Sequence, residues 1–231
     1  MTKHPIQIAP LITLPTKLLK RQSMPSCQIL LVLVGTTLFL LQTTTKLKLK
    51  TGLDEAGRGP LAGPVVVSAV TLNPQKKIHG LKDSKKLSPL QRRQLYSEII
   101  NKAYAVDIFL HDAAYIDQHN ILKATLDAMK ALILRHPFPQ NHFLIDGNKI
   151  PLLETFKISS LIKGDQKEAC ISAASIVAKV TRDHLLNFYH DLYPIYFFKQ
   201  NKGYPTKKHI LALKKHGPCP IHRRSFNHVL S

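Results

Sequence analysis

Four carboxylates occupy places where an apolar run of the sequence gives way to a loop. Asp54 and Glu55, the only adjacent acidic pair in the chain, directly precede a glycine-rich stretch. Asp146 ends one short apolar run, and Asp165 follows another. Such positions can bring carboxylates together on one side of a sheet, where they repel one another unless a cation neutralises them. Carboxylate oxygens suit Mg²⁺ or Mn²⁺, whereas Asp54 taken alone could also be a solvated loop residue or a turn cap.

The charge of the chain points to a polyanionic partner. Its 231 residues carry 33 lysines and arginines against 14 acidic residues, a formal net charge of +19. Such an excess favours binding to nucleic acid or to an anionic membrane surface. A basic surface that gathers a polyanion, together with a carboxylate cluster that holds metal ions, is what a metal-dependent phosphodiesterase needs.

Cysteine usage excludes two common kinds of framework. The three cysteines are widely spaced, odd in number and without CxxC or Cys/His spacing, so neither a disulfide framework nor a zinc site is indicated. We therefore expect a reducing compartment. The length suits one α/β domain, with or without appendages.

Alternating and apolar segments predict the elements that would position the carboxylates. Ser88, followed by a proline and then by Gln91, has the form of a capping box and marks the start of a helix. Strands first in a run and then alternating with helices predict an α/β fold with a mixed sheet flanked by helices. We expect strands at 46–50 (running into Gly52-Leu53-Asp54), 65–72, 104–110, 142–145 and 156–162, and helices at 88–102, 121–133, 168–189 and 207–216.

Residues 1–45 differ from the rest and are expected to form an N-terminal extension to a domain at 46–231. Basic residues precede an apolar run at 29–41, which is too short to span a bilayer comfortably, since about 20 residues are needed. The run matches a signal-peptide core in length, but no A-x-A cleavage site follows it. Three interpretations stay open: an uncleaved, disordered or spurious extension, a targeting or membrane-surface segment, and an additional packed strand or helix.

Six ordered segments give the chain a specific family resemblance. They cover about residues 52–226, and their order and approximate spacing resemble those of bacterial ribonuclease HII, the type 2 ribonuclease H family. The segments read TGLDEAGRGPLAGPVV, LKDSKKLS, IDQHNILKATLDAMKAL, LIDGN, KGDQKEACISAASIVAKVTRD and NKGYPTKKHILALKKHGPCPIHRRSF.

The resemblance implies a ribonuclease H-like fold, with a mixed five-stranded sheet flanked by helices and a small C-terminal helical segment. It implies an endoribonuclease that hydrolyses the RNA strand of RNA–DNA hybrids and cuts 5′ of ribonucleotides embedded in duplex DNA. The reaction would be a metal-assisted attack of water that uses Mg²⁺ or Mn²⁺ and leaves a 3′-hydroxyl and a 5′-phosphate. Nucleic acid is then the expected partner of a cytoplasmic monomer without an obligate protein partner.

The resemblance also assigns catalytic residues. Matched position by position, Asp54, Glu55, Asp146 and Asp165 would form the catalytic, metal-binding set. Glu55 carries a further condition, because neighbouring residues on a regular strand point to opposite faces. Its side chain can join Asp54 only if the strand ends or bends there; its backbone carbonyl is the alternative ligand.

A second set of matched residues would bind the substrate. Gly57, Arg58 and Gly59 match a loop that grips the backbone at the ribonucleotide, where glycines allow close approach and the arginine can pair with a phosphate. The related type 3 enzymes carry GTG there. Tyr204 matches the tyrosine that senses the junction between ribose and deoxyribose. Without the resemblance, a tight turn would account for the two glycines but poorly for Arg58, and a partly buried turn aromatic would account for Tyr204.

Other residues have less specific expectations. Asp183 is expected to form a structural ion pair, and the histidines are expected in core or surface roles. Phe197 stands where the family usually has glycine, and its larger side chain adds bulk near the C-terminal segment. Six basic side chains are each either a phosphate contact or a solvated surface charge: Lys85, Lys86, Lys179, Arg182, Arg223 and Arg224.

Two rival functions stay open. A catalytically inactive nucleic-acid-binding protein would use the same basic surface, although binding gains nothing from acids placed near phosphates. A membrane-associated protein would be anchored by residues 29–41. A cleavage assay tests the first rival, and membrane fractionation tests the second.

Overall fold

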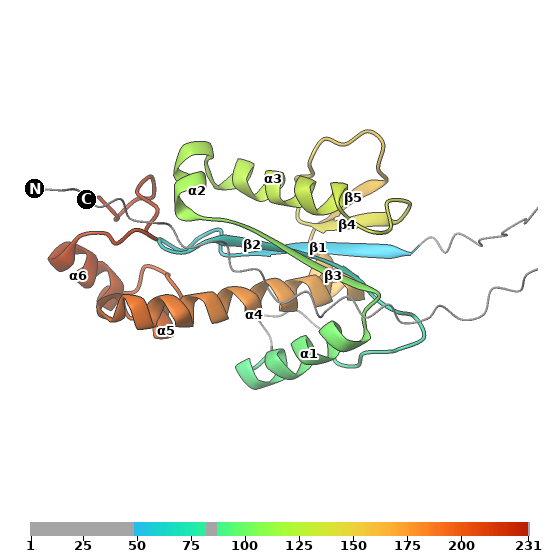
Figure 1. The fold of residues 1–231 in the computed structure, drawn as a ribbon, viewed down its shortest axis with the longest axis horizontal. Coiled ribbons are helices and arrows are strands. Elements are labelled where there is room, and N and C mark those ends of the chain that lie inside the picture. The colour runs from blue at the N-terminus through green and yellow to red at the C-terminus, as the bar shows by residue number, and fades with distance from the viewer. Residues whose placement is uncertain (1–48, 82–86, 231) are drawn as a thin grey trace, which may run out of the picture. The chain divides into compact units, whose positions relative to one another are not determined.

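A five-stranded mixed sheet lies at the centre of the residues that the structure describes (Figure 1). This computed structural model describes residues 49–81 and 87–230. The strands are β1 (Lys50–Ala56), β2 (Val65–Thr71), β3 (Ala105–His111), β4 (His142–Asp146) and β5 (Ile158–Leu161). Their order in the sheet is β3-β2-β1-β4-β5, with β1, β2 and β3 antiparallel and β1, β4 and β5 parallel. The predicted mixed sheet is confirmed.

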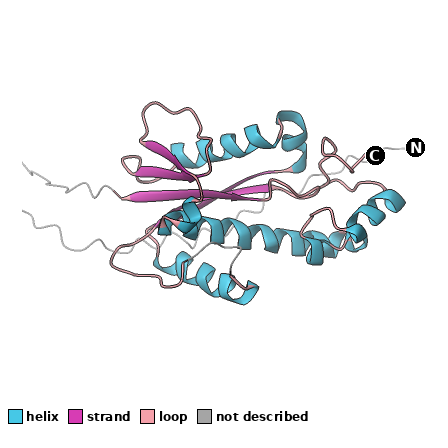
Figure 2. Ribbon diagram, turned by 180° about the vertical axis from the view of Figure 1, so that it is seen from behind, coloured by secondary structure: helices cyan, strands magenta, loops and turns pink. Residues whose placement is uncertain are grey.

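Helices cover both faces of this sheet (Figures 1 and 2). They are α1 (Pro89–Lys102), α2 (Ala113–His119), α3 (Ile121–Leu134), α4 (Ala169–Leu192), α5 (Phe198–Asn201) and α6 (Lys207–His216). α3 packs on β2 and β3, whereas α4 packs on β1 and β2 from the other side of the sheet. α1 packs against α4. α5 and α6 form the small C-terminal helical segment.

The alternation of side chains along β1 explains how both faces are covered. Leu53 points into the core between the sheet and α3, where it packs in one cluster with Val67 and Met129. Its neighbour Gly52 faces α4, and a Cβ there would lie 2.2 Å from the carbonyl carbon of Cys170. Glycine therefore lets α4 approach β1 closely, and any larger residue would force the helix away.

Helix starts follow side-chain capping. The Ser88 hydroxyl accepts from the Gln91 N–H at 3.2 Å, and the Gln91 side chain accepts from the Ser88 N–H at 2.9 Å, which confirms the predicted capping box. The sequence pattern does not predict α2, which the Asp112 side chain caps by accepting from the Tyr115 N–H. Seven residues are too few for a helical period to show in the sequence.

The first strand differs from its prediction. Within the described residues β1 begins at Lys50 and continues to Ala56, which pairs with Val66 of β2; residues 46–48 of the predicted strand lie outside the described residues. Asp54 therefore lies inside the strand and not at its end. The change from apolar to acidic side chains does not end the strand, because the backbone of β1 stays paired with β2 past that point.

Residues 1–45 lie outside the described residues, so the predicted extension and the alternatives for the run at 29–41 stay predictions. Across residues 49–81 and 87–230, no helix is both long and apolar enough to cross a membrane.

Deleting residues 1–44 should leave the unfolding temperature and the specific activity nearly unchanged. Both edges of β1 are already paired, with β2 on one side and β4 on the other, so the sheet needs no further strand there. Thermal unfolding and a cleavage assay on the truncated protein check this. An insoluble or inactive truncation would show that the extension packs on the domain, and full-length protein in a membrane pellet would favour a targeting segment.

Candidate active site

Three of the four predicted carboxylates lie within or shortly after neighbouring parallel strands, toward the carboxyl ends of those strands. β4 lies between β1 and β5 and runs parallel to both, and its register with β1 pairs Ile145 with Leu53. One residue further along, Asp54 of β1 comes beside Asp146, the last residue of β4. Asp165 follows β5 in a short 3₁₀ turn before α4. The sheet order therefore brings Asp54 and Asp146 beside each other, whereas a single metal site built from all four carboxylates stays a prediction.

Asp54 is a buried carboxylate. One of its oxygens accepts a hydrogen bond from the Glu55 N–H at 2.7 Å, and the Ser175 side chain on α4 forms a second hydrogen bond with it. Burial raises the pKa of Asp54 well above its ordinary value, and the charges of Glu55 and Asp146 raise this pKa further. A positive charge beside these oxygens would relieve both the desolvation and the repulsion.

Asp146 and Asp165 are linked through the turn that follows β5. The Gly164 N–H donates to Asp146 Oδ1 at 2.7 Å, and the next residue, Asp165, is buried. Gly164 has no room for a side chain, because a Cβ would lie 2.6 Å from Cδ1 of Ile171. The hydrogen bond from the Gly164 N–H to Asp146 holds the turn, and with it Asp165, against the end of β4.

Glu55 points away from Asp54, toward the α3 side of the sheet. β1 stays regular to its last residue, so successive side chains alternate between faces. Glu55 lines a cavity of about 290 Å³ together with Asp146, Arg58 and Met129. Because β1 stays paired with β2 past Asp54, the two side chains leave the strand on opposite faces, and both the backbone carbonyl and the side chain of Glu55 stay open as ligands.

The donor set fits a hard divalent cation. The candidate residues offer only oxygen atoms, which Mg²⁺ and Mn²⁺ prefer. Within residues 49–81 and 87–230, no lysine or arginine forms an ion pair with Asp54 or Asp146. Among these described residues, no three His, Cys, Asp or Glu side chains already converge as a metal-binding group. Asp54 and Asp146 repel each other, and a cation is what would draw the carboxylates together.

The glycine-rich loop after β1 lies against Tyr204. Gly57 has a φ of +99°, in the region that favours glycine, and a Cβ there would lie 2.1 Å from a buried arginine side chain. A Cβ on Gly59 would meet the Tyr204 ring at 3.8 Å. The Leu61 N–H donates to the carbonyl of Gly203 at 2.8 Å, which joins the loop to the tyrosine's turn. The two predicted substrate-binding segments, far apart in sequence, are neighbours.

Comparison with known proteins decides the family. The family model described as Ribonuclease HII matches residues 51–229. The chain belongs to the ribonuclease HII family. A relative named Ribonuclease HII from Idiomarina loihiensis is 48% identical over 178 residues, which cover 77% of this chain and 95% of that one. Another from an Acidovorax species is 50% identical over 175 residues, which cover 76% and 83%.

Family membership carries a general activity with it. Ribonuclease HII enzymes are type 2 ribonucleases H. They are metal-dependent hydrolases whose nucleic-acid substrates are RNA–DNA hybrids. The predicted family and enzyme class are thereby confirmed.

Solved structures share the fold of this ribonuclease HII chain. Ribonuclease H2 from Pyrococcus horikoshii superposes with a TM-score of 0.63 at 29% identity, covering 78% of this chain and 95% of that one. Ribonuclease HII from Archaeoglobus fulgidus, solved in a complex with PCNA, gives a TM-score of 0.59 at 24% identity, covering 72% and 87%. The predicted ribonuclease H-like α/β fold is confirmed.

Two arginines predicted as phosphate contacts or surface charges are buried instead. Arg182 is 1% exposed and Arg223 is 0% exposed. Arg223 donates to the carbonyls of Gly57 at 2.6 Å, Arg58 at 2.9 Å and Gly63 at 2.8 Å. Both alternatives offered for these two residues are wrong, because their guanidinium groups satisfy loop carbonyls inside the protein, out of reach of a phosphate.

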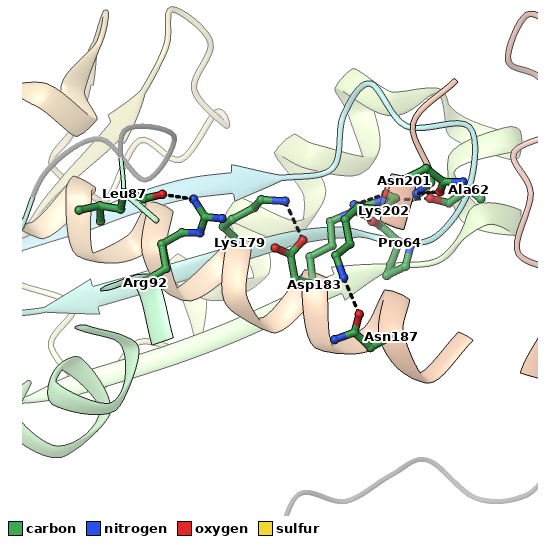
Figure 3. Close-up of polar contacts among 11 residues, drawn as sticks. Ala62, Pro64, Leu87, Arg92, Lys179, Asp183, Asn187, Asn201 and Lys202 are labelled. Carbon is green, nitrogen blue, oxygen red and sulfur yellow. Dashed lines mark hydrogen bonds and ion pairs between the residues drawn. The ribbon is translucent and has the colours of Figure 1, made fainter. Parts of the chain in front are cut away.

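The other predicted basic contacts have varied surroundings. Lys179 forms an ion pair with Asp183 at 2.6 Å, which confirms the structural role predicted for Asp183 (Figure 3). Arg224 is exposed, and its backbone N–H donates to Oδ2 of Asp117 at 2.9 Å. Lys85 and Lys86 lie outside the described residues.

Phe197 departs from the family pattern at a demanding position. It has φ 59° and ψ 34°, a left-handed conformation between a 3₁₀ turn and α5. Residues other than glycine adopt it at a cost of about 1–2 kcal/mol, which is a physical reason to expect glycine at this position. The ring lies beside Lys208, whose ammonium is 6.0 Å from the ring centroid. The departure strains the backbone locally and leaves the carboxylates untouched.

A buried histidine pair supports the turn that carries Tyr204, a role that the sequence did not single out. His209 Nδ1 lies 2.9 Å from the Tyr204 carbonyl, so this nitrogen must carry the proton. His209 Nε2 lies 3.0 Å from Nε2 of His222, whose Nδ1 accepts from the Cys219 N–H at 3.0 Å. His222 therefore donates to His209, and both rings are neutral.

Acid should destabilise the protein through this pair. Burial, with the neighbouring His209, lowers the pKa of His222 to about 4. The folded state then binds fewer protons than the unfolded state, so this stability is present above about pH 6.5 and is lost as the pH falls toward 4. Between pH 7 and 5.5 the loss from this group is about 1 kcal/mol.

Urea unfolding across this pH range measures the effect. We expect a shallower decline for His222→Gln than for the wild type, and an unchanged decline for His79→Gln, whose ring is exposed. Parallel declines in wild type and His222→Gln would show that His222 is not the group responsible.

Proposed function

We propose that this chain cuts duplex DNA on the 5′ side of an embedded ribonucleotide as well as the RNA strand of hybrids, leaving a 3′-hydroxyl and a 5′-phosphate. One observation carries the proposal: the loop that lies against Tyr204 continues directly from the strand that carries Asp54. A nucleotide gripped by residues 57–59 would have its phosphate next to the strand-end carboxylates.

The proposed catalytic and metal-binding residues are Asp54, Asp146 and Asp165, with the carbonyl or side chain of Glu55. Mg²⁺ or Mn²⁺ held there would activate water and stabilise the charge on the departing oxygen. The chain's own contribution is to place the oxygens. Asp54 is fixed by the Glu55 N–H and by the Ser175 side chain, and Asp146 by the Gly164 N–H.

Arg58 and Tyr204 would contact the substrate directly. The Arg58 side chain is 49% exposed, and its Nη1 forms a long ion pair of 3.5 Å with Oε1 of Glu55. A phosphate can therefore replace Glu55 as the partner of Arg58. Tyr204 is 44% exposed beside Gly59, where its ring can stack on a sugar or base. The 2′-hydroxyl distinguishes RNA from DNA, and Gly57 and Gly59 let the main chain approach it.

The surplus of positive charge would hold the duplex independently of sequence. A net charge of +19 favours phosphate contacts, whose contribution to affinity falls steeply with salt. Binding and cutting thus depend on different residues, which separates this proposal from an inactive nucleic-acid-binding protein.

A panel of three substrates tests the proposal. The substrates are an all-DNA duplex, the same duplex with one ribonucleotide, and an RNA–DNA hybrid, each with Mg²⁺, with Mn²⁺ and with a chelator. We expect cleavage of the second and third with either metal, and none of the first. Cleavage in the chelator would contradict the metal site, and binding without cleavage would favour the inactive binding protein.

We further infer a cytoplasmic monomer whose enzyme domain is 46–231. Both cysteines in the described part of the chain, Cys170 and Cys219, are free and buried. Burial raises the pKa of the Cys170 thiol to about 11, which makes it inert. Free, inert thiols suit a reducing compartment. Light scattering on the purified protein tests the monomer.

A further inference from the structure

A single buried guanidinium joins the two segments of the proposed recognition surface. Arg182 on α4 donates from Nε to the Pro64 carbonyl at 3.0 Å, from Nη2 to Ala62 at 2.9 Å and from Nη1 to Lys202 at 2.9 Å. Pro64 and Ala62 belong to the loop after β1, whereas Lys202 begins the turn that carries Tyr204. Figure 3 shows Ala62, Pro64 and Lys202 close together beside the C-terminal half of α4.

The backbone packs so closely around this guanidinium that there is no room for additional side-chain atoms. A Cβ on Gly57 would lie 2.1 Å from its Nε, and a Cβ on Gly63 would lie 3.4 Å from its Nη2. A Cβ on Gly203 would lie 2.5 Å from the Ala62 carbonyl oxygen. The loop, the turn and the guanidinium thus meet through glycines, so a change in the guanidinium would shift the loop against the turn, which the bond from the Leu61 N–H to the Gly203 carbonyl also joins.

We propose that Arg182 is a positioning residue for ribonucleotide recognition, which sets the loop at 57–59 against Tyr204 so that both contact the same sugar. This inference rests on the proposed function, in which loop and tyrosine act together. Arg182 is 1% exposed and does not touch the substrate itself.

The chemistry of arginine suits this role and that of lysine does not. Arginine carries donors on three nitrogens in one plane, which here serve three carbonyls of two segments, whereas lysine has a single nitrogen. None of the three acceptors is a carboxylate, so the burial of this charge is costly. Burial lowers the pKa of Arg182 to about 10, which leaves it charged at neutral pH.

The test compares Arg182→Lys with a matched control, Arg135→Lys. Arg135 also donates through a fork, to Asp107 and to the Ile108 carbonyl, but contacts neither recognition segment. Values of kcat and KM are measured for the single-ribonucleotide duplex and for a uniform RNA–DNA hybrid. We expect R182K to lower kcat/KM about tenfold on the first substrate and less than about threefold on the second, with R135K near wild type on both.

A second background shows whether Arg182 acts through Tyr204. In the Tyr204→Ala protein, R182K should reduce cleavage of the single-ribonucleotide duplex by less than about twofold further, because the residue being positioned is gone. A merely structural arginine would cause the same loss in both backgrounds. Gly63→Ala also crowds this guanidinium, with a Cβ 3.4 Å from Nη2, and lies outside the loop at 57–59, so it takes the place of R182K in this comparison if R182K unfolds at the assay temperature.

The outcomes separate this inference from the proposed function. An additive loss in the double variant, or an equal loss on both substrates, overturns the positioning role while wild-type cleavage still supports the function. If the wild type leaves the single-ribonucleotide duplex uncut, the proposed function fails first. Non-additive losses confined to that substrate establish the inference.

Discussion

The Asp54→Asn variant should lose cleavage of a ribonucleotide-containing duplex and keep its affinity for that duplex. Asparagine retains an oxygen that can accept from the Glu55 N–H, so the local structure is preserved. It removes the charge that would hold a divalent cation. A loss of about 4 kcal/mol in transition-state stabilisation, about a thousandfold in rate, is the scale expected for removing a metal's contribution.

Single-turnover cleavage beside fluorescence anisotropy measures both halves of this prediction. Asp165→Asn should behave like Asp54→Asn. Asp127→Asn is the matched control, because Asp127 is paired with Lys123 on α3 and belongs to no strand end. Near wild-type turnover of Asp54→Asn in saturating metal would remove Asp54 from the site, and a parallel loss of binding would mean that the carboxylate shapes the surface.

The second large effect is expected from Tyr204→Ala. Removing one stacked aromatic contact to nucleic acid costs about 1–3 kcal/mol, so cleavage at a single ribonucleotide should fall by about 5-fold to 150-fold. Affinity for an all-DNA duplex, and its salt dependence, should stay close to wild type, because phosphate contacts supply that affinity. Tyr204 is exposed, and its ring contacts the loop only at the surface, so the fold should tolerate the change.

Cleavage of the single-ribonucleotide duplex is measured beside all-DNA affinity at two salt concentrations. Tyr104→Ala is the control, since Tyr104 is similarly exposed, at 39% against 44%, but precedes β3. An equal loss in cleavage and in DNA affinity would make Tyr204 a structural residue. No loss in either would take it out of the substrate site.

The elements of the fold follow from local patterns where those patterns are long or chemically distinct. The capping box at Ser88 and Gln91 predicts the start of α1 because two reciprocal hydrogen bonds need those residue types. The end of β1 is less predictable. Its last residues, including Glu55, stay extended because β2 pairs with them, and a pairing partner distant in sequence leaves no local pattern.

In the candidate site too, residues with a distinctive local pattern are predictable, whereas residues placed by distant partners are not. The candidate carboxylates stand out in the sequence because acids after apolar runs are distinctive, and the sheet order then explains why Asp54 and Asp146 lie side by side. The sequence predicts a surface position for Arg182 and Arg223, because arginines are rarely buried unless paired. A helical pattern does hint at Arg182, which lies four residues from buried Ala178 and Leu186 on the same face of α4. Nothing comparable marks Arg223, whose carbonyl partners come from a loop about 160 residues earlier.

The position and chemistry of the cut test the central claim most directly. A duplex with one ribonucleotide, labelled at both ends of the strand, is cleaved in Mg²⁺, and its product termini are mapped and identified. Attack of water directed by the strand-end carboxylates predicts one cut 5′ to the ribonucleotide, with a 3′-hydroxyl on one product and a 5′-phosphate on the other. A 2′,3′-cyclic phosphate would contradict the account, because it would show that the ribose hydroxyl itself had attacked.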